Sequence, residues 1–422
     1  MSFDSSPSPF DTVIQRSTDC MKWGAQSWQL TPAQAVADPL PMWVADMDFA
    51  SPPAVLDALQ QELDNGILGY PYIKGIKESF ISFAQKRHSI TIDSSHVAIA
   101  SGMLSSIAIL IELYSQEGDS IILPFPSYHP FVDIINNLNR KILPWPLSYD
   151  EKEHSFSLDF PLLHKITEEN NPPILLFCSP HNPTGIVFSE DELNKVALLA
   201  KKNNMLIISD EIHADLVFKH EKHIPFSAIA STYNIHCATC MAPSKTFNIA
   251  GEHFSIVVFN DIEMKTTFAN RLKAIQSSPD VLAAVASKAA YDGAYNWLIS
   301  LVDYLEENSK IIEQVLTKYE SSIVFIRPKA SFIGLFDCKI LYNAVVKDSE
   351  EHPLVYASRG DGGLLSRFFG QKAGIAMNDG SWFGSDYHQF VRFNFAAPKE
   401  VVKDAMEKIC EAEKALLTEY SL

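Results

Sequence analysis

Three segments of the chain place chemically useful side chains directly after an apolar stretch. They read SPHNPTG at 179–185, SDEIH at 209–213 and APSKTFN at 242–248. The first contributes the amide of Asn182, the second the carboxylate of Asp210 and the third the amine of Lys245. Singly each is ordinary, because Asn-Pro-Thr-Gly forms turns, Asp is a common cap and a loop lysine is usually solvated. Their interest depends on whether the fold brings them together.

The surrounding sequence predicts a sheet that would do so. From about residue 95, short apolar stretches alternate with amphipathic helical ones, and the stretches at 174–178 and 205–209 are apolar almost throughout. This alternation predicts an α/β fold with a mostly parallel sheet covered by helices on both faces. Ligands of such sheets bind at the carboxyl ends of the strands. An amide, a carboxylate and an amine at that edge match the needs of pyridoxal 5'-phosphate, which takes a Schiff-base lysine and an acidic partner for its ring nitrogen.

The rest of the chain predicts a second, smaller domain. A helical stretch at 261–318 ends in a long connector helix, and grouped strands and helices follow it, as in an α+β domain. We expect residues 51–295 to form the large cofactor domain and residues 296–422 the small C-terminal domain, to which the N-terminal segment 1–50 also belongs. The polar stretch 338–362 reads as an insertion in the small domain that alters substrate choice.

Composition excludes several classes of protein. The 422 residues include 34 basic and 51 acidic side chains, a net charge of −17 that disfavours nucleic acid and anionic lipid as partners. No stretch reads as a signal peptide, a membrane helix or a glycine-rich nucleotide loop. Six scattered cysteines favour a reducing compartment, so a cytoplasmic location is expected. No metal site is expected, since Cys237 and Cys240 read as core thiols and His220 to His223 as ordinary surface.

The three motifs, in this order and at these separations, resemble the fold type I pyridoxal-phosphate enzymes of the class I/II aminotransferase superfamily over nearly the whole chain. Further segments are similar to the MalY/PatB branch of cystathionine β-lyases and cysteine desulfhydrases, which are C-S lyases. They are FDTVIQRSTDCMKWG, PMWVADMDFASPP, NGILGY, DEIHADLVF and FGSDYHQFVRFNFAAP. The resemblance implies a seven-stranded, mostly parallel sheet sandwiched by helices, a small α+β domain, pyridoxal 5'-phosphate as cofactor, and a homodimer with the active site at the subunit interface.

The resemblance also implies roles for single residues. Lys245 would bind the cofactor covalently and, once released, remove the substrate α-proton. Asp210 would keep the ring nitrogen protonated, and Asn182 would donate a hydrogen bond to the ring oxygen. His213 stands where transaminases present a tyrosine, and a locally satisfied histidine is the alternative reading. Tyr128 would stack on the cofactor ring.

Other residues match positions that contact the cofactor phosphate or the substrate. The Ser101-Gly102-Met103 turn before a helix suits the cofactor phosphate, with a plain tight turn as the alternative. Ser244 and, from a partner subunit, Tyr70 match further phosphate contacts. Arg392 matches the arginine that binds the substrate carboxylate, and the segment Trp43 to Asp46 is expected beside the substrate.

The sequence departs from the family pattern at His253, where many fold type I enzymes carry a phosphate-binding arginine. The reaction that these residues predict is elimination of a thiol from an L-cysteine S-conjugate such as cystathionine, giving pyruvate and ammonia. An aminotransferase would use the same residues. A regulatory protein that keeps the fold but acts by binding another protein is a third reading, disfavoured by the complete catalytic set.

Overall fold

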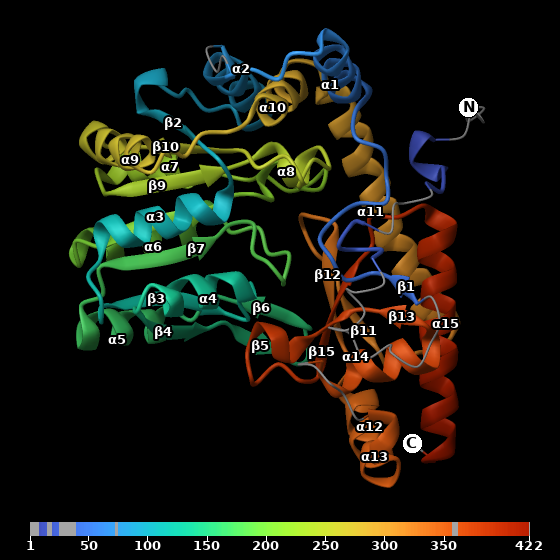
Figure 1. Cartoon of the computed structure of the whole chain (residues 1–422). Coiled ribbons are helices and arrows are strands. Elements are labelled where there is room, and N and C mark those ends of the chain that lie inside the picture. The colour runs from blue at the N-terminus through green and yellow to red at the C-terminus, as the bar shows by residue number, and fades with distance from the viewer. Residues whose placement is uncertain (1–7, 15–18, 25–38, 72–74, 357–361, 422) are drawn as a thin grey trace.

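The computed structural model describes residues 8–14, 19–24, 39–71, 75–356 and 362–421. Its centre is a seven-stranded sheet in the order β2-β10-β9-β8-β7-β3-β4 (Figure 1). β10 is antiparallel to both of its neighbours, and the other pairs are parallel. The strands are β2 (Val97–Ala100), β3 (Ser120–Phe125), β4 (Lys141–Pro146), β7 (Ile174–Cys178), β8 (Leu206–Asp210), β9 (Cys237–Met241) and β10 (Ser255–Phe259). The predicted α/β fold with a mostly parallel sheet is confirmed.

Helices cover both faces of this sheet, which explains the nearly continuous apolar strands. In β7, Leu175 and Phe177 face one core and Leu176 faces the other. The first face packs against α5 (Phe160–Asn170), α6 (Glu190–Lys202) and α7 (Phe226–Tyr233). The second face packs against α3 (Met103–Tyr114), α4 (His129–Asn137) and α9 (Ile262–Ala274).

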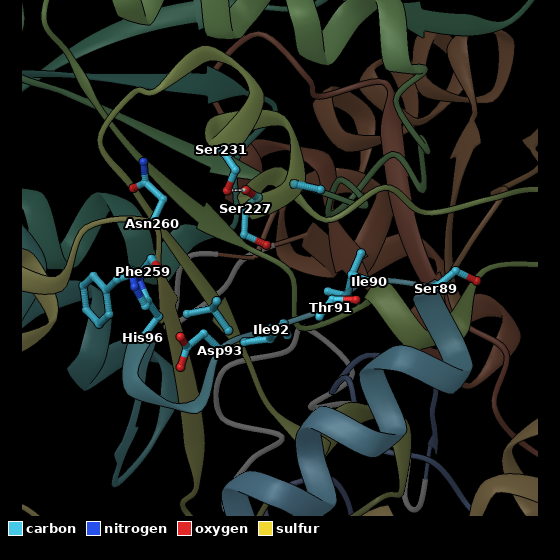
Figure 2. Close-up of a pocket in the computed structure, with 12 residues that line it drawn as sticks. Ser89, Ile90, Thr91, Ile92, Asp93, His96, Ser227, Ser231, Phe259 and Asn260 are labelled. Carbon is cyan, nitrogen blue, oxygen red and sulfur yellow. Dashed lines mark hydrogen bonds between the residues drawn. The ribbon is translucent and has the colours of Figure 1, made fainter.

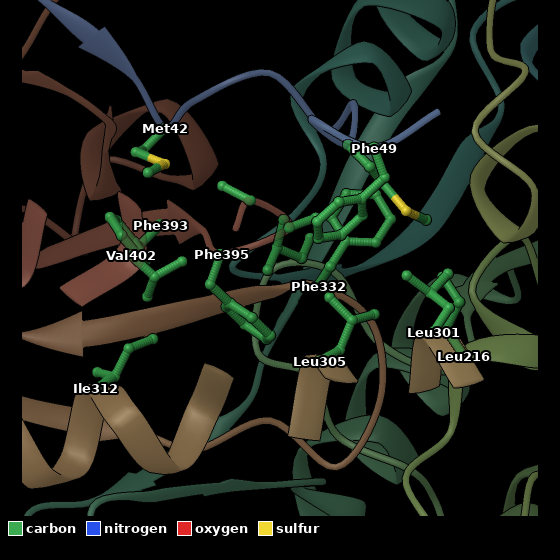
Figure 3. Packing of buried hydrophobic residues seen from close by; sticks show 14 of the residues in the cluster. Met42, Phe49, Leu216, Leu301, Leu305, Ile312, Phe332, Phe393, Phe395 and Val402 are labelled. Atoms are coloured by element: carbon green, nitrogen blue, oxygen red, sulfur yellow. The ribbon is translucent and has the colours of Figure 1, made fainter. Parts of the chain in front are cut away.

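A second sheet stands beside the first, in the order β11-β12-β15-β14 and antiparallel throughout. Its strands are β11 (Val324–Ile326), β12 (Ile333–Asp337), β14 (Asn378–Asp379) and β15 (Phe390–Asn394). It packs against α11 (Tyr295–Lys318) and α15 (Lys399–Glu419), where Leu305, Phe395 and Val402 meet in a buried core (Figure 3). The long connector helix expected before residue 318 is α11.

The two ends of the chain meet in the structure. β1 (Leu40–Pro41) pairs in parallel with β13 (Ile375–Ala376). The core that holds Met42 and Phe49 also holds residues of α11 and β15 (Figure 3). Three more helices, α1 (Pro53–Asn65), α2 (Ile76–His88) and α10 (Val281–Gly293), pack together beyond the edge of the large sheet formed by β2. The domain boundaries remain a prediction.

The stretch 338–362, which the sequence indicated as a polar insertion, is largely helical. It forms α12 (Lys339–Glu351) and α13 (Pro353–Tyr356), while residues 357–361 lie outside the described ones. Leu341, Ala344 and Val345 are buried where α12 meets α14 (Leu364–Phe368) and α15. The charged side chains cover the outer face of an amphipathic helix. In Figure 1 this pair of helices lies far from α8 (Pro243–Thr246), which carries Lys245.

Candidate active site

A cavity of about 300 Å³ opens at the carboxyl ends of β7, β8 and β9. Parallel pairing sets Asp210, the last residue of β8, level with Cys178 of β7 and Cys240 of β9. The loops that follow these strands therefore converge, as expected for an open parallel sheet. Of the predicted residues, the cavity is lined by Ser101, Gly102, Met103, Tyr128, Asn182, Asp210, His213, Ser244 and Lys245.

Lys245 lies on α8, a single turn that Pro243 begins. Its Nζ donates a hydrogen bond to the carbonyl oxygen of Ala45, in the N-terminal loop. Burial lowers the pKa of Lys245 and the Arg392 charge lowers it further, whereas Asp46 and Asp210 raise it. A lysine whose amine is neutral more often is a better nucleophile and a better base.

Asp210 is buried, and its Oδ1 accepts a hydrogen bond of 3.0 Å from the backbone N–H of Ile212. Burial raises the pKa of Asp210 to about 7; the Ile212 hydrogen bond lowers it, the neighbouring Glu211 raises it and Lys245 lowers it again. An isolated carboxylate is costly in such a place unless a cation shares it. A protonated pyridine nitrogen is a cation that would fit beside it.

His213 lines the cavity and also has a local hydrogen-bond partner, so both readings of it stay open. Its Nδ1 lies 3.0 Å from the hydroxyl oxygen of Ser331. Burial lowers the pKa of His213 to about 3, and the charges of Lys245 and Arg392 add to this, so the ring is neutral at physiological pH. Tyr128, at the start of α4, packs edge to face on Phe131 with 5.4 Å between ring centroids. Its own ring also lines the cavity.

One end of the cavity is formed by the turn before α3. Gly102 has φ of 103°, a conformation that side chains rarely adopt, and precedes the first helical N–H groups. The Ser101 hydroxyl pairs with that of Ser277 at 2.6 Å. A Cβ added to Gly102 would stand 3.6 Å from Nδ1 of His253, so the imidazole borders this turn. Helix N–H groups, Ser244 and His253 together suit a phosphate.

Arg392 of β15 is buried next to the cavity and contacts its lining residue Asn182. Its guanidinium donates hydrogen bonds to Asn182 Oδ1 (3.2 Å), Asn378 Oδ1 (2.8 Å) and the carbonyl oxygen of Trp43 (3.0 Å). The ring of Phe383 lies 4.9 Å from the guanidinium carbon. Two buried donors, Arg392 Nε and Trp43 Nε1, have no hydrogen-bond partner in the described structure. Unpaired buried donors beside a cation fit an anionic ligand such as a carboxylate.

The N-terminal loop at residues 43–49 is held in place by side chains from other parts of the chain. Asn248 exchanges hydrogen bonds with the backbone of Met47 and also donates to the carbonyl oxygen of Phe49. The buried ammonium of Lys22 donates to Asp48 and to the carbonyl oxygen of Asp46, at 2.9 Å each. Of the segment Trp43 to Asp46, Ala45 is the residue that lines the cavity, where its carbonyl group accepts the hydrogen bond from Lys245.

Four predicted site residues are not among those that line the cavity: Arg392, Trp43, Asp46 and Tyr70. Arg392 contacts the lining residue Asn182, whereas Tyr70 lies elsewhere. Its side chain is fully exposed (104%) and lines a separate groove with residues near Asp280. This placement is compatible with the role expected of it, which is to enter the site of a partner subunit.

His223 corrects the sequence reading of residues 220–223 as ordinary surface. Its ring is buried, and Nε2 lies 2.7 Å from Glu211 Oε2. Cys237 and Cys240 are buried thiols, as expected. Among the described residues, no group of three or more His, Cys, Asp or Glu side chains is arranged to hold a metal ion.

A second cavity, of about 470 Å³, lies at the other end of the β2–β10 pair (Figure 2). Hydroxyl groups of Ser89, Thr91, Ser227 and Ser231 line it. The one imidazole there, His96, is already hydrogen-bonded to the carbonyl oxygen of Phe259 at 2.9 Å. The cavity around Lys245, by contrast, is lined by an amine, a carboxylate and an amide.

Sequence reasoning missed Asn378 and Ser331, which hold Arg392 and His213 in place. Nothing in their local sequence marks them, because each reaches the site through strand pairing or a turn far from the motifs. The Ala45 carbonyl group was likewise not predicted as a partner of Lys245.

Comparison with known proteins places the chain in a family. The profile of the family described as "Aminotransferase class I and II" matches residues 38–409. The chain belongs to this family, and the fold predicted from the resemblance is confirmed.

Three relatives show the branch of the family. The chain is 30% identical to cystathionine beta-lyase PatB of Bacillus subtilis, over 89% of this chain and 92% of PatB. Cystalysin of Treponema denticola, whose crystal structure contains a pyridoxal 5'-phosphate cofactor, is 28% identical with a TM-score of 0.86, covering 99% of this chain and 100% of cystalysin. The PLP-bound C-S lyase of Staphylococcus hominis is 29% identical with a TM-score of 0.84, covering 97% and 98% of the two chains.

Proposed function

We propose that this protein is a pyridoxal-phosphate-dependent C-S β-lyase, which eliminates a thiol from an L-cysteine S-conjugate. The observation that carries the proposal is that Lys245, Asp210 and Asn182 line one cavity, with Arg392 hydrogen-bonded to Asn182. The names of PatB, cystalysin and the Staphylococcus hominis enzyme support the reaction type. With water, R–S–CH₂–CH(NH₃⁺)–COO⁻ gives the thiol R–SH, pyruvate and ammonium.

Each of these residues has a separate role in the proposed reaction. When bound, the cofactor supplies an electron sink conjugated to the substrate α-carbon. Arg392 binds the substrate carboxylate, and its hydrogen bonds to Asn182 and Asn378 fix the guanidinium plane. Lys245 holds the cofactor and takes the α-proton, helped by the burial that lowers its pKa. Asp210 holds a proton on the ring nitrogen.

A different set of groups would bind the cofactor phosphate. Met103 and the next residues of α3 offer free backbone N–H groups, with Ser244 and His253 beside them. His253 stands at the position where many fold type I enzymes carry an arginine. We propose that it takes over part of that contact.

The test separates the lyase from its alternative, an aminotransferase acting through the same residues. Purified protein is given L-cystathionine, and pyruvate and free thiol are measured; the lyase produces them in equal amounts. Glutamate formed from an amino acid plus 2-oxoglutarate, without pyruvate or thiol, would contradict the lyase. Lys245→Ala is expected to abolish both products. Lys222→Ala, at an exposed lysine, is the matched control.

We propose further that the protein is a homodimer with the active site at the subunit interface. Leu63, Ile67, Leu68 and Tyr70 expose large apolar side chains on one stretch of chain, which a partner subunit would cover. Tyr70 would then reach the partner's phosphate site. This explains why it is exposed in the single chain.

Mixing two inactive variants tests the shared site. Lys245→Ala removes the amine of one subunit, while Tyr70→Asp spoils only the partner's site. After unfolding and joint refolding, heterodimers contain one intact site, and about a quarter of the wild-type activity is expected. No recovery, or a monomer in sedimentation with full activity, would contradict the shared site.

Two broader expectations belong with this proposal. Residues 1–50 and 296–422 would form the small domain and residues 51–295 the large one, as the β1–β13 pairing supports. Six free cysteines, five of them buried, support a reducing compartment such as the cytoplasm. Among the described residues, no helix is long and apolar enough to cross a membrane.

A further inference from the structure

A buried chain of hydrogen bonds lies directly behind Lys245. The hydroxyl of Thr246, the next residue, donates to Asp215 Oδ2 at 2.8 Å. The other carboxylate oxygen, Oδ1, lies 2.7 Å from Nε2 of His88. All three side chains are buried, and the chain joins the end of α2 to the lysine turn α8.

The charge state of Asp215 fixes the direction of these bonds. Burial raises the pKa of Asp215, but the hydrogen bond and charge of His88, the Thr246 hydroxyl and the Arg87 charge lower it below its ordinary value. The group is therefore a carboxylate, which only accepts, so Thr246 Oγ1 and His88 Nε2 are donors. The Arg87 guanidinium donates to the Asp215 carbonyl oxygen at 2.7 and 3.1 Å, which anchors the backbone as well.

A second pair of the same kind supports the strand end that carries Asp210. Glu211 accepts hydrogen bonds from Ser209 Oγ (2.9 Å) and from the backbone N–H of Phe226 (2.7 Å), and pairs with His223. The rings of His223 and His88 lie edge to face with 5.5 Å between centroids. The residues that directly follow Lys245 and Asp210 are thus both anchored in one buried polar layer.

The lysine turn needs such support from outside. The helix α8 is only four residues long, and a helix of one turn does not hold itself in place. Its first residue is Pro243, which has no N–H to donate. The side-chain bond from Thr246 is therefore one of the contacts that tie the end of the turn to the rest of the protein, together with those of Asn248.

We propose that Thr246, Asp215 and His88 are positioning residues that set where the Lys245 amine stands in the cavity. The inference rests on the proposed function, in which that amine both holds the cofactor and moves the α-proton. A displacement of about 1 Å at such a group lowers the rate by up to about 100-fold. Substrate affinity depends mainly on Arg392, which this chain does not contact.

Thr246→Val and Thr246→Ser test the inference, because the first removes the hydroxyl at nearly constant volume and the second keeps the hydroxyl but lacks the methyl group. Thr246→Val is expected to lower kcat by about 10- to 100-fold with KM changed less than about twofold. Thr246→Ser is expected to restore kcat. Thr239→Val is the matched control, since Thr239 is a fully buried threonine of β9 whose hydroxyl lies 3.5 Å from Cys237 Sγ.

A second readout does not depend on turnover. Cofactor is added to the cofactor-free protein, and formation of the lysine-bound absorption band is followed by rapid mixing. The rate is expected to fall in Thr246→Val and to stay near wild type in Thr246→Ser and Thr239→Val. A Thr246→Val enzyme with wild-type kcat and band formation would overturn the inference, as would a loss that Thr246→Ser shares.

The outcomes separate this inference from the proposed function. Wild-type protein that forms no such band refutes the cofactor assignment itself, whereas a normal wild type with a normal Thr246→Val refutes only the positioning role. If Thr246→Val does not fold, His88→Gln and His88→Met replace it, at the far end of the chain. The glutamine keeps a donor for Asp215 and is expected to be active; equal kcat in both would overturn the inference.

Discussion

Asp210→Asn is expected to make the cofactor-free protein more stable to unfolding and the cofactor-bound protein less stable. Asp210 is buried on the central strand β8, with Cys178 and Cys240 level with it on either side. Burial raises its pKa from an ordinary 3.8 to about 7, although the Lys245 charge lowers it. Ionising this carboxyl therefore opposes folding unless a positively charged ring nitrogen is bound.

The size of the effect follows from the pKa difference between the folded and unfolded states. Because the folded pKa is the higher one, the free energy of unfolding falls as the pH rises from about 4 through 7, and it stays low above 7. A shift of about 3 pKa units at 1.36 kcal/mol each gives about 4 kcal/mol. For 422 residues with about 2.1 cal/mol/K of unfolding entropy each, that corresponds to about 5 °C in Tm.

Thermal unfolding of cofactor-free wild type and Asp210→Asn at pH 4 and pH 8 is the assay. The variant is expected to match wild type near pH 4 and to unfold about 5 °C higher at pH 8. With cofactor added the order is expected to reverse, since the amide cannot hold the ring nitrogen protonated. A cofactor-free Asp210→Asn that is less stable at pH 8, or a difference that does not change with pH, would refute this reasoning.

Three further predictions follow from contacts in and around the site. Arg392→Lys loses the forked donors that reach Asn182, Asn378 and the Trp43 carbonyl group. KM in steady-state kinetics is therefore expected to rise about 10- to 100-fold, with the cofactor absorption band unchanged. An unchanged KM would show that Arg392 does not bind the substrate carboxylate. Ser331→Ala removes the hydroxyl that holds Nδ1 of His213 and is expected to weaken cofactor affinity about tenfold in an equilibrium titration. Identical titrations of variant and wild type would count against this role. His223→Leu leaves buried Glu211 without its imidazole partner and is expected to lower Tm by about 3–6 °C in calorimetry. His220→Leu, on the exposed side of the same loop, should change Tm little, and equal effects would contradict a stabilising role of the buried His223–Glu211 contact.

The sequence alone was sufficient for the parts of the site that follow apolar strands. Asn182, Asp210 and Lys245 each stand just after a strand whose composition predicts a buried parallel sheet, and such strands end at one edge. Gly102 was found for the same reason, since it separates a strand from an apolar helix. Local pattern and global fold agree at these positions.

The contacts that depend on chain segments meeting from a distance were not predictable. Asn378 reaches Arg392 only because β14 pairs with β15, and His223 is buried only because its loop returns to Glu211. The helix at residues 339–351 was not predicted for another reason. Its many charges conceal the helical spacing of Leu341, Ala344 and Val345.

The central claim is that the cavity holds pyridoxal phosphate on Lys245. Borohydride reduction of the cofactor-loaded protein, followed by mass mapping of the proteolytic fragments, tests it most directly. The account predicts one phosphopyridoxyl group per chain, on the peptide that contains Lys245, and none on Lys245→Ala. Labelling of another lysine, or no labelling of wild type that has been incubated with the cofactor, would contradict it.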